Sequence, residues 1–126
     1  MKLLNFSHPL TAKQRTQIET AIGQEIETIT DAPVHFSVEL PFAEQVVALI
    51  EGLSIHPEQW QTEVWLVVPP ALNYITGLLL AELHGRMGHF PTILRLRPVQ
   101  TALTTEYEFA EILNLQAVRE LARTRR

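Results

Sequence analysis

The stretch Lys-Leu-Leu-Asn-Phe-Ser-His-Pro-Leu-Thr, residues 2–11, decides how this chain folds. Its apolar pattern predicts a strand over Lys2–Phe6, and a short polar turn follows. Thr11 then begins a helix signal, because it is a good N-cap and Gln14 stands three positions later, in the spacing of a capping box. A strand that passes through a tight polar turn into a helix makes an anion site, since the helix N-terminus offers unpaired N–H groups and a partial positive charge.

The rest of the chain continues this alternation of strand and helix patterns. Further strand patterns, judged by β-branched and apolar content, cover Glu25–Ile29, Val34–Leu40, Glu63–Val68, Thr92–Arg97 and Thr105–Ile112. Helix patterns cover Ala12–Ile22, Phe42–Ile50, Ala71 to about Met87, and a last segment that Asn114 caps and that runs to about Arg123. The sequence does not show which of the segments 25–29 and 34–40 is the better strand candidate, and one of them is expected to be an edge strand. The pattern at 105–112 fits a last strand or an extended segment.

Three further features of the sequence can be checked against the structure. Gly23 is expected to stop the first helix and Pro98 to stop the strand over Thr92–Arg97. Ser54–Thr62 is predicted to be a polar connection. Strands that alternate with helices predict a single α/β domain over residues 1–126, with a mostly parallel sheet covered on both faces.

Composition limits the classes of function. A chain of 126 residues with 46% hydrophobic residues has the size and the core of one compact domain. The charged fraction of 19% is low, so some surface is expected to be covered by another subunit. The net charge of −4 argues against binding to long nucleic acid, which needs a broad basic face.

The absence of cysteine excludes disulfides, thiolate catalysis and Cys-based zinc sites. It is compatible with a cytoplasmic location, which we expect. The apolar run at the N-terminus is too short for a signal peptide. Pro69, Pro70, Asn73 and Glu82 interrupt the longest apolar region, residues 64–83, so a membrane span is not expected.

The candidate site follows from where ligands bind in open α/β sheets, beyond the carboxyl ends of the strands at the point where the strand order reverses. If strands 2–6 and 63–68 are neighbours there, the loops 7–11 and 69–73 meet, and both point helix N-termini into one crevice. Ser7 and Thr11 could donate to a phosphate or ribose, or only cap the helix. His8 could bind phosphate or act as acid or base, or be an exposed turn residue. Asn73 could contact a base or ribose, or be an ordinary residue of the first helical turn.

Two arginines lie on one face of the strand 92–97. Arg95 and Arg97 should repel each other there, so an anionic partner or carboxylates from elsewhere in the fold are expected to compensate them. Arg97 is the stronger ligand candidate, because it sits at the carboxyl end of the predicted strand. The alternative is a structural salt bridge.

Several chemistries have no sequence support. The chain has neither a Walker motif nor G-x-G-x-x-G. Its five histidines are dispersed without a His-Glu-x-x-His pattern, so neither a metal site nor a cofactor is predicted. No paired carboxylates or Ser-His-Asp arrangement can be argued from spacing, and a conventional general-base enzyme is not indicated.

Three segments carry a family resemblance: Leu-Leu-Asn-Phe-Ser-His-Pro-Leu-Thr at the start, Val-Trp-Leu-Val-Val-Pro-Pro-Ala-Leu-Asn in the centre, and Pro-Thr-Ile-Leu-Arg-Leu-Arg-Pro. Together, over about residues 1–100, they resemble small CRISPR-associated proteins of type III systems, stand-alone relatives of the CRISPR-associated Rossmann-fold (CARF) sensor domain. The resemblance implies a homodimeric Rossmann-like fold that binds cyclic tetra-adenylate across the dimer axis. It implies ligand contacts at Ser7, His8, Pro69, Asn73 and Arg97, and it identifies no catalytic residue.

Three hypotheses of function follow. The first is a binding protein that captures cyclic tetra-adenylate and damps type III signalling. The second is a metal-independent ring nuclease, in which the ligand's own 2′-hydroxyl attacks and the protein bends the ring and stabilises charge. His8 or Arg97 would assist that attack or steady the charged transition state. The third is an adaptor domain without a small ligand.

Overall fold

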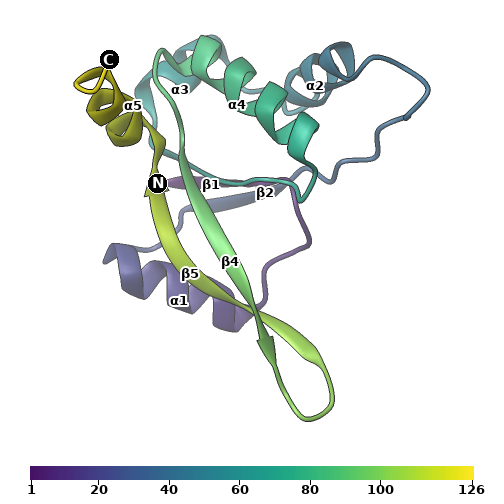
Figure 1. The fold of residues 1–126 in the computed structure, drawn as a ribbon, viewed down its shortest axis with the longest axis vertical. Helices are drawn as coiled ribbons and strands as arrows, with labels where there is room; N and C mark the ends of the chain where they lie inside the picture. The colour runs from purple at the N-terminus through teal and green to yellow at the C-terminus, as the bar shows by residue number, and fades with distance from the viewer.

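The computed structural model describes residues 1–126 as alternating strands and helices (Figure 1). The strands are β1 (Lys2–Asn5), β2 (Thr28–Asp31), β3 (Trp65–Val68), β4 (Thr92–Gln100) and β5 (Thr105–Asn114). The helices are α1 (Ala12–Ile22), α2 (Phe42–Glu51), α3 (Pro57–Thr62), α4 (Asn73–Met87) and α5 (Leu115–Arg123). None of the helices combines the length and the apolar character needed to cross a membrane.

The strands form one five-stranded sheet in the order β2-β1-β3-β4-β5. β1 pairs in parallel with both β2 and β3, β3 pairs in parallel with β4, and β5 runs antiparallel to β4. The mostly parallel α/β sheet predicted from the sequence is therefore confirmed, and it is consistent with a Rossmann-like domain. The chain leaves β1 toward β2 and returns to β3 on the opposite side, so the strand order reverses between β1 and β3, as the site prediction requires.

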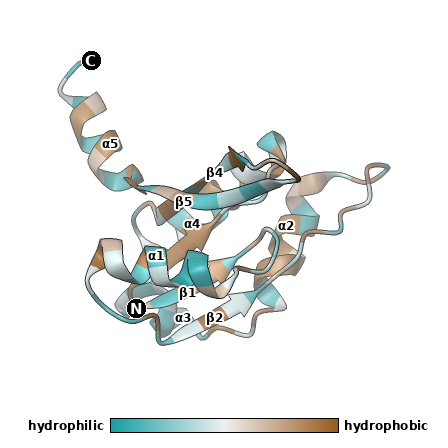
Figure 2. Cartoon of the chain, turned by 90° about the horizontal axis from the view of Figure 1, so that it is seen from below, coloured by the Kyte–Doolittle hydropathy of each residue, from teal (hydrophilic) through white to brown (hydrophobic).

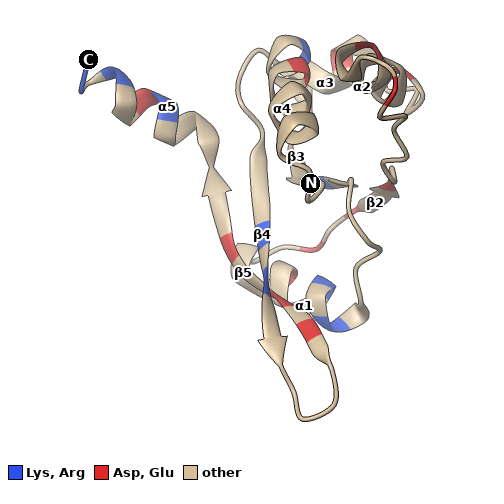
Figure 3. Cartoon of the chain, turned by 45° about the vertical axis from the view of Figure 1, so that its right-hand side comes forward, with Lys and Arg blue, Asp and Glu red and all other residues tan.

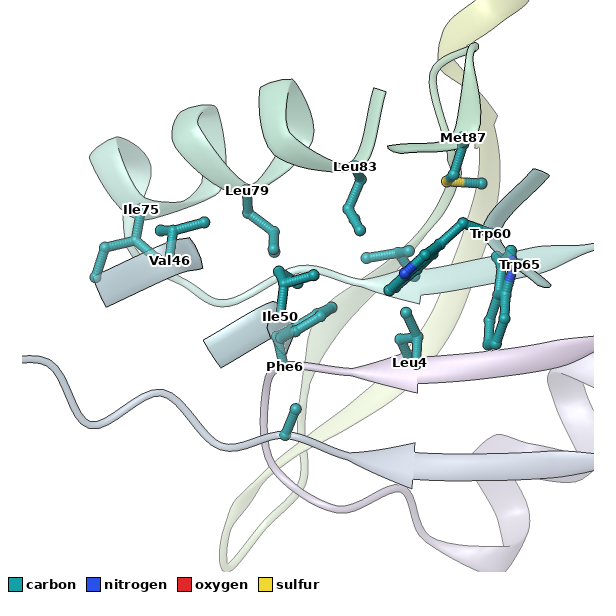
Figure 4. Packing of buried hydrophobic residues seen from close by; sticks show 12 residues of the cluster. Leu4, Phe6, Val46, Ile50, Trp60, Trp65, Ile75, Leu79, Leu83 and Met87 are labelled. Atoms are coloured by element: carbon teal, nitrogen blue, oxygen red, sulfur yellow. The ribbon is translucent and has the colours of Figure 1, made fainter. Parts of the chain in front are cut away.

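The larger core cluster lies between the sheet and the helices α2, α3 and α4 (Figure 4). Leu4 and Val67, which are partners in the β1–β3 register, both point into it. Leu79 and Leu83 of α4 meet them with no exposed surface. The continuous apolar sequences of β1 and β3 are thus explained by burial on both faces, as is usual in parallel sheets.

The smaller core cluster lies on the opposite face of the sheet, under α1. Leu3 and Leu66 point to this side, and Ile18 of α1 packs on them. α1 has the bounds that the sequence predicts. Gly23 ends it in the left-handed region, with φ of 82°, which glycine adopts without steric cost.

Three predictions about elements are wrong. Val34–Leu40 forms no strand: it is the irregular crossing from β2 to α2, and the edge strand is β2. Part of the predicted polar connection 54–62 is the short helix α3, whose N-cap is His56 and whose first residue is Pro57, a favoured position for proline. Pro98 does not stop β4. Beyond Ile93, β4 pairs only with β5, so its other edge is open there, and proline is tolerated at such an edge.

The C-terminal elements extend away from the body of the domain. The β4–β5 hairpin reaches below the sheet in Figure 1, and α5 projects from the end of β5 (Figure 2). Asn114 caps α5 as predicted, because its side-chain oxygen accepts a hydrogen bond from the backbone N–H of Ala117 at 3.0 Å.

Candidate functional site

A pocket of about 410 Å³ lies beyond the carboxyl ends of β1 and β3, at the point where the strand order reverses. The β1–α1 loop contributes Ser7, His8 and Pro9. The β3–α4 segment contributes Val68, Pro69 and Ala71, and β4 contributes Leu94, Arg95 and Leu96. Gln14 of α1 and Tyr107 of β5 complete the lining. The two loops that the sequence analysis expected to meet do converge on one pocket.

Asn5 holds the β1–α1 turn in shape from beneath. It is the last residue of β1 and has no exposed surface. Its side-chain oxygen accepts from the backbone N–H of Ser7 at 3.0 Å, and its amide donates to the His8 carbonyl at 2.8 Å. The same amide donates to Asp31 Oδ1 of β2 at 3.0 Å. These bonds fix the backbone that carries Ser7 and His8 into the pocket.

Thr11 is the N-cap of α1. Its hydroxyl oxygen accepts from the backbone N–H of Gln14 at 3.1 Å, and the Gln14 side chain accepts from the Thr11 backbone N–H at 2.9 Å. This capping box uses one N–H of the first helical turn that the anion site would offer. Thr11 is not among the residues that line the pocket.

The second loop reaches the pocket through Pro69 and Ala71 rather than through Asn73. Asn73 is the exposed first residue of α4, and its side-chain oxygen accepts from the Tyr74 backbone N–H at 2.9 Å. The loop before it is held by Thr76, whose hydroxyl donates to the Pro70 carbonyl at 2.8 Å. The structure therefore brings Ser7, His8 and Pro69 together and leaves Asn73 outside the lining.

The two arginines of β4 are compensated by carboxylates of β5, one of the two alternatives that the sequence left open. Arg95 Nε lies 3.1 Å from Glu111 and Arg97 Nε lies 2.7 Å from Glu108, across the hairpin. Figure 3 shows basic segments on β4 and acidic segments on β5. Arg95 lines the pocket, whereas Arg97 is farther along the hairpin and does not. The Arg95–Glu111 pair is half-exposed, so an anion in the pocket could compete with Glu111 for the guanidinium.

The lining combines three kinds of group. Arg95, His8 and the Ser7 hydroxyl are suited to a phosphate, and the Tyr107 ring, 57% exposed, offers a flat surface for a base. Leu94, Leu96 and the two loop prolines make the remaining surface apolar. The pocket therefore suits a ligand that is anionic at one end and aromatic at the other. The histidine and acidic side chains form no cluster of three or more that could hold a metal ion.

Sequence reasoning missed three residues that shape the site: Asn5, Gln14 as a lining residue, and Tyr107. Asn5 carried a signal, because a polar residue inside an apolar strand needs a hydrogen-bond partner. Tyr107 carried none, since only the hairpin brings it near Ser7.

Comparison with protein-family models, curated proteins and solved structures finds no match, and no relative assigns a role to these residues.

Proposed function

We propose that this protein binds cyclic tetra-adenylate and holds it, which lowers the free concentration of this second messenger and damps type III CRISPR signalling. The identity of the ligand follows from the resemblance to the CARF-like family. The observation that carries the proposal is the convergence of Ser7, His8, Arg95 and Tyr107 on one pocket where the strand order reverses.

The pocket matches the parts of an adenylate unit. A phosphate accepts hydrogen bonds from a guanidinium, an imidazole and a hydroxyl, and charge-assisted bonds of this kind are the stronger ones. An adenine ring stacks on an aromatic side chain irrespective of hydrogen-bond pattern. The pocket volume of about 410 Å³ falls in the usual range of small-molecule sites.

A ring of four nucleotides is larger than one such pocket. The proposal therefore includes a homodimer, in which a two-fold axis brings two pockets to opposite sides of one ring. The repeated chemistry of the ring matches the repeated chemistry of the two subunits. Each subunit then contributes half of the site.

Isothermal titration calorimetry of the full chain with cyclic tetra-adenylate tests the proposal. We expect tight binding with one ring per two chains, and much weaker binding of linear tetra-adenylate and of AMP, which lack the closed shape. Absence of binding at micromolar protein would refute the proposal and would favour an adaptor domain.

A ring nuclease is the second candidate, because His8 lines the pocket and could assist attack by the 2′-hydroxyl or steady the charged transition state. Chromatography of labelled ligand after incubation with excess protein separates the two functions. An intact ring after hours supports sequestration, whereas conversion to linear products that His8→Ala abolishes supports cleavage.

A further inference from the structure

The helix α5 presents an uncovered apolar stripe. At 100° per residue, its five apolar residues fall on one side, and Gln116, Arg119, Glu120 and Arg123 fall on the other. Val118 is 59% exposed and Leu121 is 56% exposed, and no residue of α5 is buried. Only the first turn is tied to the body, where Gln116 accepts a hydrogen bond from the Phe90 backbone N–H at 3.0 Å. Such complete segregation is typical of a helix that packs on another surface.

Charge is divided unevenly between α5 and the body. Residues 115–126 contain four arginines and one glutamate. Residues 16–85 contain ten acidic residues and neither lysine nor arginine. In Figure 3, the blue segments of α5 and the red segments of α2 lie at opposite ends of the molecule. Five of these ten acidic side chains are ion-paired with cations outside residues 16–85. Glu39, Glu44 and Glu58, on or beside α2 and α3, form no ion pair, and they are the acidic surface that complements α5 in charge.

That acidic side of the molecule also carries an apolar groove. A shallow groove of about 360 Å³, wide open to solvent, lies between the segment after β2 and α2, lined by Pro33, His35, Phe36, Gln45, Ala48 and Leu49. Glu44, four residues before Ala48 on the surface of α2, borders the groove and forms no ion pair. Glu51, three residues after Ala48, is already paired with Arg86 of α4 at 2.7 Å. An apolar floor with an acidic border matches a helix with an apolar stripe and a basic polar face.

We propose that α5 of one copy docks its apolar stripe into the groove beside α2 of a second copy, with its arginines toward the unpaired carboxylate of Glu44 at the border. The two surfaces differ, so copies joined through them form a reciprocal two-fold pair or a head-to-tail chain or ring. This contact uses neither the pocket nor its lining residues. It does not depend on the proposed ligand.

Sedimentation velocity of the full chain over a wide range of protein concentration tests the contact. We expect the average size to rise with concentration and to fall in high salt, which screens exposed charges. The double variant Val118→Ser/Leu121→Ser removes the stripe, and Ala48→Lys places a charge in the groove. Both change exposed residues, so both proteins should fold, and each should weaken association by about tenfold or more, as at interface hot spots. Val64→Ser, which changes a 65% exposed valine outside both surfaces, is the control and should assemble like the wild type.

Mixing the two variants tests whether α5 of one copy contacts the groove of another copy rather than a different surface. The stripe variant keeps an intact groove and Ala48→Lys keeps an intact α5, so their equimolar mixture should form a larger species that neither forms alone. Assembly of Ala48→Lys at wild-type strength would overturn the proposal, because α5 would then contact a different surface. A wild-type chain that sediments as a monomer at every concentration would overturn it too. If either of these results is found and the chain binds phosphatidylserine vesicles through α5, a membrane surface is the partner of α5 instead of a second copy.

Discussion

At the scale of single residues, Asn5 is the strongest structural determinant of the candidate site. Its side chain satisfies Ser7 N–H, the His8 carbonyl and Asp31 at once, with no contact to solvent. Replacement by alanine leaves these groups unpaired beside the core. We expect Asn5→Ala to lower the free energy of unfolding by about 2–3 kcal/mol, the range for buried groups that lose their partners. Urea denaturation measures it.

Asn73→Ala is the matched control for that substitution. Asn73 is exposed, and its side chain bonds only to the adjacent Tyr74 N–H. We expect a loss of about 0.5 kcal/mol or less, as for other surface changes. A loss as large as that of Asn5→Ala would contradict the role given to the buried side chain. Because the Asn73→Ala variant is expected to stay folded, its affinity for the ligand also reports whether Asn73 contacts that ligand.

A second residue-scale prediction concerns Arg95 and Glu111. If Arg95 binds the phosphate, Arg95→Gln should weaken binding of cyclic tetra-adenylate roughly tenfold to a hundredfold, as for a lost charged hydrogen bond. Glu111→Gln should strengthen binding about two- to fivefold, because it releases Arg95 from a half-exposed ion pair. Calorimetry measures both.

Arg97→Gln is the comparison for this pair. Arg97 stays a predicted contact from the sequence, but Glu108 holds it outside the pocket lining. We expect a smaller effect than that of Arg95→Gln. Loss of binding in Arg97→Gln with full binding in Arg95→Gln would move the ligand away from the pocket and onto the hairpin.

The residues of the site could be predicted from the sequence only where they follow the strands directly. Ser7, His8 and Pro69 come immediately after β1 and β3, so the rule for parallel sheets places them. The sequence could not show that Arg95, rather than Arg97, lines the pocket. Arg97 was favoured because the strand was expected to end there, but β4 continues through Pro98 to Gln100.

At the scale of elements, α1 protects the open edge of β5. Residues 107 and 109 are two apart, so their backbone groups point to the same side of the strand. Gln14 donates to the Tyr107 carbonyl at 2.8 Å, and Gln17 accepts from the Phe109 N–H at 3.0 Å. Two glutamine side chains thus occupy backbone groups that a further strand would otherwise use.

We therefore expect Gln14→Ala/Gln17→Ala to aggregate more readily than the wild type. The change exposes two edge groups and also removes the Gln14 half of the capping box, so it lowers stability by about 1.5–4.5 kcal/mol for three hydrogen bonds. Light scattering during heating and urea denaturation measure the two effects. Gln61→Ala, which removes one exposed bond to the Pro57 carbonyl, is the control. Equal aggregation of both variants would argue against edge protection.

The sequence predicted elements best where local and tertiary signals agree. α1 combines an N-cap, a capping box and a terminal glycine, and its bounds are as predicted. Val34–Leu40 has strand-like residues but forms no strand: Val34 and Phe36 pack on the larger core cluster instead, and the outer side of β2 stays unpaired. The helix α3 was missed because its N-cap, His56, is not one of the residues that usually mark a helix start, and because six residues hold too little periodicity to indicate a helix.

At the scale of the whole molecule, the central strands connect the two core clusters. Leu3 and Leu66 point to the α1 side, and their neighbours Leu4 and Val67 point to the side of α2–α4. If one cluster is lost, one face of β1 and β3 becomes exposed. The other cluster packs on the opposite face of the same strands, so it is weakened as well. Trp60 and Trp65, with ring centroids 5.2 Å apart, belong only to the larger cluster. Their fluorescence reports one side of the sheet, whereas circular dichroism reports the whole chain.

This arrangement predicts that a change on the α1 side is felt by tryptophans on the other side. Ile18→Ala removes a fully buried side chain of the smaller cluster and should lower stability by about 2–5 kcal/mol. Because the shared strands make unfolding cooperative, the fluorescence and circular dichroism midpoints in urea should shift together. Ile112→Ala, at a position on β5 that is 39% exposed, should shift both by less. If the fluorescence midpoint stays in place while the dichroism midpoint moves, the two faces of the sheet unfold separately. The residues that line the pocket would then belong to two units that unfold independently.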